Sequence, residues 1–305
     1  MNKKKSPLRF TLLFFCIILA SWWSFSSLNP PESSSSSNLE AWVLDVGQGE
    51  SVLLKDPSGK TLLFDGGPDD SVLNQLGEVL PPFDRTIDLA ILSHNHSDHI
   101  RGLISVLERY DVKEVWISGA IHTTNDYQHF LEAIKDNHTP TKVVFFDKTA
   151  CKAICPKPTP FGNLLLQVYH PMENMTGQRP NDQHDATVSV KVSYGQESLF
   201  LTGDLNEGHE TDMMKACQPP TCSLAATILQ VPHHGSDTGL SEAFLEAVHP
   251  SSAVIPVGLH NKFKHPRQII LDRLTTAQIP IYRTDLQSRI HMSIGQDAYS
   301  ITTEK

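Results

Sequence analysis

The chain has 305 residues, of which 39% are hydrophobic and 19% charged, and its formal net charge is -9. This composition is typical of a globular protein with one large domain or two small ones. The acidic balance excludes a chain that is basic throughout and binds nucleic acid by overall charge, although positive charge concentrated at one site can still serve an anionic substrate. The 15 histidines are numerous enough to prompt a search for metal ligands.

Residues 1–27 are predicted to be a signal peptide or an N-terminal membrane anchor, followed by a Pro/Ser-rich linker over residues 28–38. The basic stretch Lys3–Arg9 precedes the apolar run Phe10–Ala20, which is shorter than the roughly 20 residues of a full span and suits a signal peptide. Trp22–Trp23 at a membrane interface would instead suit an uncleaved anchor in the inner membrane. Both interpretations predict an exported protein, periplasmic or otherwise extracytoplasmic, that is either secreted or anchored.

Four cysteines outside the apolar run form two close pairs, which suits an oxidising compartment. Local pairing of Cys151 with Cys155 and of Cys217 with Cys222 is the prediction, and the sequence leaves crossed pairing open. A four-cysteine zinc site is the alternative, but the spacings are looser than those of zinc ribbons.

Residues 39–305 are predicted to form one domain in which short strands alternate with helices. In chain order, apolar periodicity predicts strands over 41–46, 51–55, 61–65 and 87–93, a helix over 100–109, a strand over 112–117, a helix over 126–136 and a strand over 142–146. There follow strands over 164–169, 188–194 and 199–202, a helix over 207–216, a strand over 227–231, a helix over 241–248, a strand over 253–257, a helix over 267–278, and strands over 281–283 and 289–293. About a dozen strands can be buried as two packed sheets with helices outside.

The strongest chemical signal is His94-x-His96-x-Asp98-His99, between an apolar strand and a helix. A tight loop after a buried strand can turn alternate residues inward, so His94 and His96 can face one metal ion while Asp98 and His99 face another. Imidazole and carboxylate ligands together suit zinc, manganese or iron. The alternative is a histidine-rich surface loop, but three histidines and an aspartate within six residues at a strand end argue against it.

This run resembles the signature of the metallo-β-lactamase superfamily, which implies an α/β fold with a four-layer αββα sandwich. The family also places an early Asp, a His after a later strand, a bridging Asp and a final His in a fixed order, and this chain has a residue for each. The resemblance implies that Asp65 supports the metal loop, and that the further ligands are His170, Asp204 and His234. Within the last motif His233 is the alternative ligand; otherwise it faces the substrate, together with Ser236.

Flanking motifs narrow the resemblance to the extracytoplasmic hydrolase domain of ComEC-like DNA-uptake channel proteins. They cover nearly the whole domain in order: 44–50, 92–99, 201–204, 232–236, 257–266 and 282–285. The chain departs from the family at Arg101, where a glycine is usual, and at 181–185, which replaces an Asn-rich turn. The polytopic channel has no counterpart here, so this chain is not expected to translocate DNA itself.

The ligand set implies two divalent ions, Zn²⁺ or alternatively Mn²⁺. Bridged by Asp204, they would lower the pKa of a shared water, supply hydroxide and offset negative charge on a phosphoryl oxygen. Asp98 is therefore expected to serve catalysis as well as metal binding.

Help for the leaving group must come from elsewhere, and His265 is the candidate acid. It lies in the most basic stretch of the predicted domain, where Lys262, Lys264 and Arg267 are predicted to hold phosphates and Phe263 to stack on a base. A solvated helix start with chance charges is the alternative interpretation of this stretch.

The expected function is a metal-dependent phosphodiesterase or nuclease that acts on extracytoplasmic DNA or a related anionic phosphodiester. The alternatives are a metallo-hydrolase of another ester, a lactone, a β-lactam or a phosphocholine ester, and a non-catalytic exported DNA-binding competence accessory. The basic stretch favours an anionic substrate over a lactam. The remaining histidines are interpreted as surface or structural residues: His122, His129, His138, His209, His249, His260 and His291.

Overall fold

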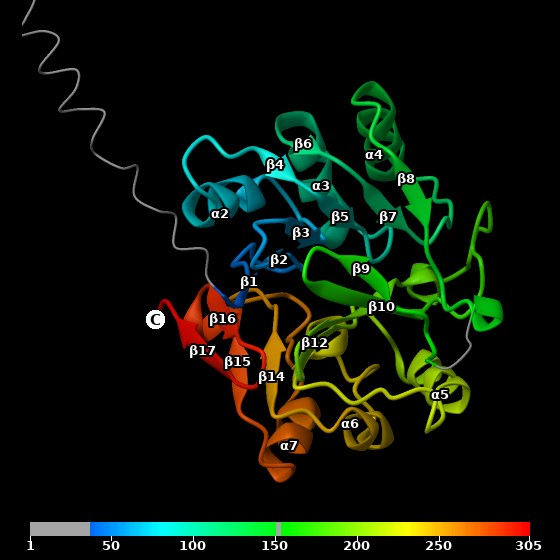
Figure 1. Ribbon diagram of the computed structural model, residues 1–305, viewed down its shortest axis with the longest axis vertical. Helices are drawn as coiled ribbons and strands as arrows, with labels where there is room; N and C mark the ends of the chain where they lie inside the picture. The colour runs from blue at the N-terminus through cyan, green and yellow to red at the C-terminus, as the bar shows by residue number, and fades with distance from the viewer. Residues whose placement is uncertain (1–36, 151–153) are drawn as a thin grey trace, which may run out of the picture. The chain divides into compact units, whose positions relative to one another are not determined.

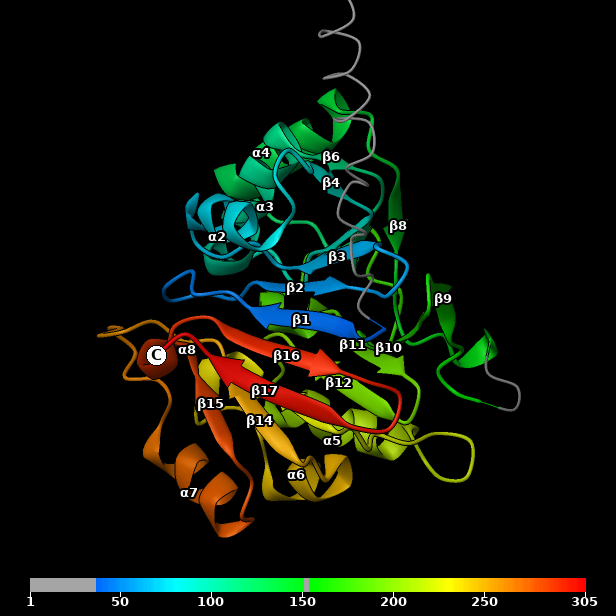
Figure 2. The same cartoon turned by 60° about the vertical axis from the view of Figure 1, so that its left-hand side comes forward.

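Two β-sheets carry most of the strands in the computed structural model, which describes residues 37–150 and 154–305 (Figures 1 and 2). The predicted leader, most of the linker and Cys151 lie outside the described residues. The first sheet has eight strands in the order β17 (Tyr299–Thr303), β16 (Ile290–Ile294), β1 (Leu39–Val43), β2 (Val52–Lys55), β3 (Thr61–Phe64), β5 (Leu89–Ile91), β7 (Val115–Ile117) and β8 (Thr141–Val143).

The second sheet has seven strands in the order β15 (Ile281–Arg283), β14 (Ser252–Ile255), β13 (Ile228–Gln230), β12 (Glu197–Leu201), β11 (Ser189–Tyr194), β10 (Leu164–His170) and β9 (Thr159–Phe161). Strands β12 to β15 pair in parallel, and β9 to β12 pair antiparallel. A separate parallel pair is formed by β4 (Thr86–Ile87) and β6 (Asp111–Val112).

Helices cover the outer face of each sheet. The helices α2 (Ser71–Val79), α3 (Ser97–Arg109) and α4 (Asn125–Asp136) share a buried apolar cluster with the first sheet. The helices α5 (Glu207–Ala216), α6 (Glu242–Val248) and α7 (Gln268–Thr276) share another with the second sheet, and the short α8 (Thr284–Gln287) follows β15. The predicted four-layer αββα sandwich is therefore confirmed.

The core between the sheets follows from the period-two alternation of strand side chains. Leu54 and Phe64 face the second sheet, whereas Leu53 and Leu63, their neighbours along the chain, face the helices on the other side. Strands buried on both faces read as nearly continuous apolar runs, which is why β2 and β3 were predictable from sequence.

Two predicted strands are divided in the structure. The run 87–93 is interrupted at Asp88, whose side chain accepts a hydrogen bond from the Thr61 amide at 2.9 Å, and the run 112–117 divides into β6 and β7. The sequence did not predict α2, β9, α8 or β17. Cys217 and Cys222 form a disulfide, the local pairing that their spacing suggested, and Cys155 is also disulfide-bonded. Within the described residues we find no helix with the length and apolar character needed to span a membrane.

Adjacent leucines of β10 test the packing between the sheets. Leu164 is 1% exposed in the core and Leu165 is 45% exposed. We expect Leu164→Ala to lower the free energy of unfolding by about 2–5 kcal/mol, because it removes buried methyl groups and leaves a cavity. Leu165→Ala, the matched control, should change it by less than about 0.5 kcal/mol. Denaturant titration measures both, and equal effects would contradict this description of the core.

Candidate metal centre

A buried carboxylate holds the loop between β5 and α3. Asp65, at the end of β3, accepts hydrogen bonds from the Ser93 amide at 2.7 Å and the Ser93 hydroxyl at 2.6 Å, and contacts His99 Nδ1 at 2.7 Å. The side chains of Asp65 and His99 are fully buried. Because Nδ1 of His99 is engaged by Asp65, its Nε2 faces the centre, which is the supporting geometry that the resemblance implied for Asp65.

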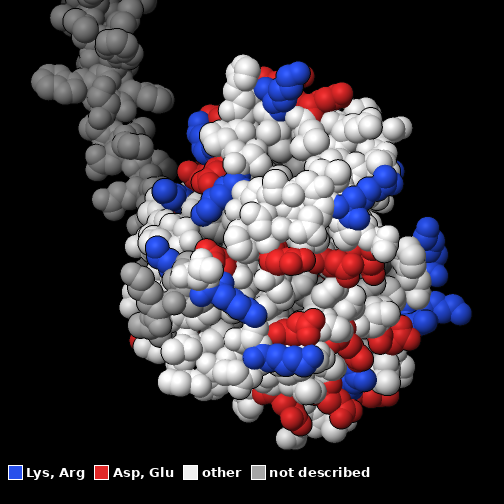
Figure 3. Space-filling model, turned by 90° about the vertical axis from the view of Figure 1, so that its right-hand side faces the viewer, with Lys and Arg blue, Asp and Glu red and all other residues white. Residues whose placement is uncertain are grey.

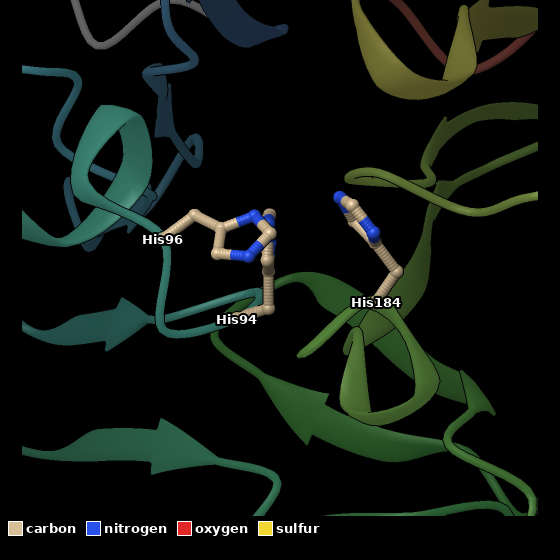
Figure 4. Close-up of side chains that lie close together, drawn as sticks. All are labelled: His94, His96 and His184. Atoms are coloured by element: carbon tan, nitrogen blue, oxygen red, sulfur yellow. The ribbon is translucent and has the colours of Figure 1, made fainter. Parts of the chain in front are cut away.

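A short 3₁₀ turn, η2 (Gln183–Ala186), brings His184 to the same place. The Asp182 carboxylate accepts a hydrogen bond from the His184 amide and lies 2.6 Å from His184 Nδ1. Asn95, between His94 and His96, donates to the Gln183 side chain at 3.0 Å and so connects the metal loop to this turn. As Figure 4 shows, His94 and His96 approach from one side and His184 from the other.

Two further loops of the second sheet supply the remaining side chains. Asp204 follows β12, and the Gln230 side chain accepts the amides of Thr202 and Gly203 at 2.6 and 2.9 Å to fix that strand end. The turn η3 (Pro232–Gly235) presents His233 and His234, which both adopt left-handed backbone with φ of 50° and 54°. Such backbone costs energy for a residue with a Cβ, and it is concentrated at functional sites.

The two carboxylate oxygens of Asp204 face different partners. Oδ2 lies 3.9 Å from His94 Nε2 and 3.8 Å from His184 Nε2. Oδ1 lies 3.5 Å from His99 Nε2 and 3.7 Å from His234 Nε2. The carboxylate therefore stands between two groups of imidazoles.

Two sets of ligand atoms follow from this arrangement. The first consists of His94, His96, His184 and Oδ2 of Asp204. The second consists of Asp98, His99, His234 and Oδ1 of Asp204. Four ligands around an ion at about 2.1 Å in tetrahedral geometry stand about 3.4 Å apart. The Asp204 oxygens lie 3.5–3.9 Å from the imidazole nitrogens, close to that value, and the ligand atoms of each candidate group lie within 4.8 Å of one another. Each set therefore suits a small divalent cation.

Unpartnered buried atoms provide an independent test of this fit. Within the described residues, His99 Nε2, His184 Nε2, His234 Nε2 and Asp204 Oδ1 are buried and have no hydrogen-bond partner. Buried polar atoms are nearly always partnered. In the three histidines the opposite nitrogen is engaged, for His234 by the Pro256 carbonyl at 2.8 Å. The free nitrogens converge on the places where cations would be held, so the residues fit two divalent ions.

Electrostatics distinguish the two sets. Burial lowers the pKa of His94 well below its usual value, and burial with the neighbouring His184 lowers the pKa of His96 to about 4. Both rings are therefore in the neutral form that ligates metal. In the second set burial is outweighed by carboxylates, chiefly Asp204, which raise the pKa of His99 and His234.

Glu50 is a buried carboxyl that the sequence interpretation missed. Its side chain groups with Asp65 and His99, and neither of its oxygens has a hydrogen-bond partner in the described part of the chain. Burial and the charge of Asp65 raise its pKa well above the usual value. Its position directly after the Gly47-Gln48-Gly49 turn was visible in sequence, but its burial was not.

The structure does not bring His170 to either ligand set. A register shift in the β10–β11 pairing falls between Val168 and His170, and a bulge of this kind redirects the following side chains. His170 Nδ1 instead contacts the Thr187 carbonyl, and its ring lies 4.7 Å from that of His209 on α5. The structure therefore does not group His170 with the predicted ligands, and we propose His184 in its place. The signal in sequence was the departure at 181–185.

His233 and Ser236 are the predicted substrate-facing residues of the last motif. His233 is partly exposed, and its Nε2 lies 3.6 Å from Asp204 Oδ2. It forms a further candidate group with His184 and Asp204, so it adjoins the first set and does not replace His234 in the second. Ser236 is buried, and its hydroxyl lies 3.0 Å from that of Thr238, so it is not available to a substrate in this structure.

The basic loop 261–267 packs beside η3. Asn261 closes it by donating to the His265 carbonyl at 2.7 Å and accepting the His265 amide at 2.9 Å, and the Arg267 amide donates to the Gly235 carbonyl at 2.8 Å. Lys262 and Lys264 are exposed, whereas Arg267 lies 3.5 Å from the Asp237 carboxylate.

The His265 ring lies 5.8 Å from that of His233, and Phe263 stacks on it at 5.7 Å. Burial, His234, His233 and Arg267 lower the pKa of His265 to about 4. In this state the ring is neutral at pH 7, so its role as an acid stays a prediction that requires substrate charge to raise its pKa.

Comparison with known proteins identifies the family. Residues 44–259 match the family model for the metallo-beta-lactamase superfamily, and the chain belongs to that superfamily. This confirms the predicted family and agrees with the predicted class, a metal-dependent hydrolase. The chain is similar to Recombination protein 2 of Haemophilus influenzae, at 27% identity over 95% of this chain and 32% of that protein. It is also similar to ComE operon protein 3 of Bacillus subtilis, at 27% identity over 84% of this chain and 33% of that protein.

The chain thus spans about a third of the length of these curated relatives. Among solved structures, it is similar in fold to Tm1679, a metal-dependent hydrolase of the β-lactamase superfamily, with a TM-score of 0.51 and 16% identity over 87% of this chain and 99% of that one. It is also similar in fold to CmlA, a diiron β-hydroxylase from Streptomyces venezuelae, with a TM-score of 0.52 and 14% identity over 84% of this chain and 54% of that one.

The exchange of His170 for His184 can be tested by metal content. We expect His184→Ala to lower the affinity of the first set for divalent ions by at least about tenfold, because it removes one imidazole ligand. His170→Ala should retain the wild-type metal content, since that ring ligates nothing in the described chain. Elemental analysis after dialysis against a weak chelator measures both. Loss of metal in His170→Ala with retention in His184→Ala would restore the original ligand set.

Proposed function

We propose that this member of the metallo-β-lactamase superfamily is a two-metal phosphodiesterase that acts on nucleic acid or a related anionic chain outside the cytoplasm. The observation that carries the proposal is the Asp204 carboxylate, whose two oxygens each face a separate set of ligands. A paired centre suits phosphoryl transfer because the attacking and leaving oxygens can each be neutralised. Zn²⁺ is the proposed metal because imidazoles predominate among the ligands, and Mn²⁺ is the alternative.

Divalent ions bound at the two sets would activate a water molecule as nucleophile and offset charge on the phosphoryl oxygens. The protein's own side chains orient the ligands and hold them in place. Asp65 and Asp182 fix the rings of His99 and His184 so that their Nε2 atoms face the centre. Asp98, only partly buried, is the carboxylate ligand nearest to solvent and therefore to an incoming substrate.

The basic loop supports an anionic substrate over a lactam. Lys262 and Lys264 are exposed beside the centre, and the Lys262 ammonium lies 5.0 Å from the ring centre of Phe263. Ammonium groups position phosphates, and an exposed aromatic ring offers a stacking surface for a base. Localised charge of this kind is needed here, because Asp and Glu side chains gather over the lower half of the face in Figure 3 and the net charge is -9.

Export is part of the proposal. The Cys217–Cys222 disulfide suits an oxidising compartment, and the basic and apolar N-terminal residues have the composition of a signal peptide or anchor.

A substrate panel tests the activity. The full chain, stripped by chelator and reloaded with Zn²⁺ or Mn²⁺, should hydrolyse bis(p-nitrophenyl) phosphate and DNA, and it should leave nitrocefin intact. Asp204→Asn should lower kcat/KM on the order of 10³-fold, since it removes the charge that both ligand sets share. Asp297→Asn, in the exposed turn between β16 and β17, is the matched control. Turnover of nitrocefin, or of a phosphocholine ester, without turnover of DNA or bis(p-nitrophenyl) phosphate would overturn the proposal.

Substrates with different leaving groups can test whether His265 acts as the acid. A DNA alkoxide needs a proton as it leaves, whereas p-nitrophenolate leaves without one. We therefore expect His265→Ala to lower kcat for DNA by about 10²–10⁴-fold and to leave kcat for bis(p-nitrophenyl) phosphate nearly unchanged. Full turnover of DNA by His265→Ala, or equal losses on both substrates, would exclude the role.

A further inference from the structure

A polar hollow of about 260 Å³ is lined by His122, Arg179, Pro180, Asn181 and Gln183. None of these residues belongs to either ligand set. The lining offers a guanidinium, an imidazole and two side-chain amides, all of which can donate hydrogen bonds to phosphate oxygens. The hollow therefore has the chemistry of an anion site without a part in holding metal.

The hollow borders the first ligand set. Gln183 immediately precedes His184, and its side chain accepts a hydrogen bond from Asn95, the residue between His94 and His96. A group bound in the hollow thus lies next to the metal loop and the η2 turn at once. The hollow thus meets the centre at Asn95 and Gln183, whereas the basic loop 261–267 adjoins His233 through His265.

A row of rings joins these two sides. Centroid separations are 4.6 Å from His96 to His184, 4.7 Å from His184 to His233, 5.8 Å from His233 to His265 and 5.7 Å from His265 to Phe263. All five side chains are at least partly exposed. His96 and His184 belong to the first ligand set, so an extended chain that followed this row of rings would pass that set.

The basic loop and the hollow each carry positive charge that is not ion-paired. Within residues 37–150 and 154–305, no carboxylate lies within ion-pair distance of Arg179, Lys262 or Lys264, and Arg179 donates only to the Thr123 hydroxyl at 3.1 Å. By contrast, Arg101 is matched by a carboxylate at 2.9 Å. In an acidic protein, exposed cations without acidic neighbours are the groups available to an anionic ligand.

We propose that the hollow is a second phosphate subsite, in which Arg179 and His122 bind a phosphate of the same chain that is cleaved at the metal centre. This rests on the proposed phosphodiesterase function and specifies its substrate as a polymer. One flanking phosphate lies on Lys262 and Lys264, and another lies in the hollow. With His122 Nδ1 accepting from the Thr124 hydroxyl, 3.0 Å away, Nε2 carries the proton that a phosphate oxygen can accept.

Single-stranded DNA oligonucleotides and bis(p-nitrophenyl) phosphate are the probes. On the full chain, Arg179→Ala should raise KM for a long oligonucleotide about tenfold and leave kcat/KM for the small diester unchanged, since only the long chain reaches the hollow. Oligonucleotide binding is measured by fluorescence anisotropy in the Asp204→Asn background. There Arg179→Ala should reduce the slope of log affinity against log salt concentration by about 0.7, which is the contribution of one phosphate contact. Arg179→Lys, which keeps the charge, should restore most of that slope.

Arg109→Ala is the matched control, because Arg109 is an exposed arginine at the far end of α3 and pairs with Asp70. This substitution should change the kinetic constants for neither substrate. An unchanged KM and salt slope in Arg179→Ala, while wild type cleaves both substrates, would overturn the subsite alone. Equal losses on the small diester would overturn it too, since the residue would then act on the centre. Failure of wild type to cleave any diester would instead overturn the proposed function, and the binding slopes would still decide whether the hollow holds a phosphate.

Discussion

The hydrogen bonds of Asp65 are the constraint on which the metal centre depends. This carboxylate is fully buried, adopts left-handed backbone with φ of 57°, and engages Ser93 and His99 together. A buried charge is tolerated only when such partners satisfy it. The same contacts therefore set the path of the loop after β5 and the orientation of one ligand. Since β3 lies in the interior of the first sheet, packing of that sheet positions the metal loop.

The centre also depends on the contact between the two sheets. His94, His96, Asp98 and His99 follow a strand of the first sheet, whereas His184, Asp204 and His234 come from loops of the second. Bringing carboxylates and imidazoles together without cations leaves buried atoms unsatisfied, at a cost of about 1–3 kcal/mol each. Divalent ions bound at the two ligand sets would remove that cost and would link the two halves of the sandwich.

Sequence periodicity was sufficient for the elements that bury one apolar face, such as α3 and β11, and for the metal loop, whose spacing is local. Sequence periodicity failed where contacts between residues far apart in the chain determine which side chains come together. The choice between His170 and His184 depends on a bulge in the β10–β11 pairing and on the hydrogen bond from Asn95 to Gln183, 88 positions apart. A shift of one residue reverses the face that a strand presents, and no local pattern reports it. The burial of Glu50 was hidden for the same reason.

The charge distribution supports the proposed anionic substrate in spite of the acidic net charge of -9. At physiological salt the Debye length is about 8 Å, so acidic groups over the distant surface are largely screened at the mouth of the centre. The charged side chains close to the centre then determine its affinity for an anionic ligand. Lys262, Lys264 and Arg179 make no ion pair with a carboxylate of the described residues. The buried carboxylates of the centre would be matched by cations bound at the two ligand sets. The arrangement of these few side chains, more than the net charge of -9, therefore supports the proposed anionic substrate.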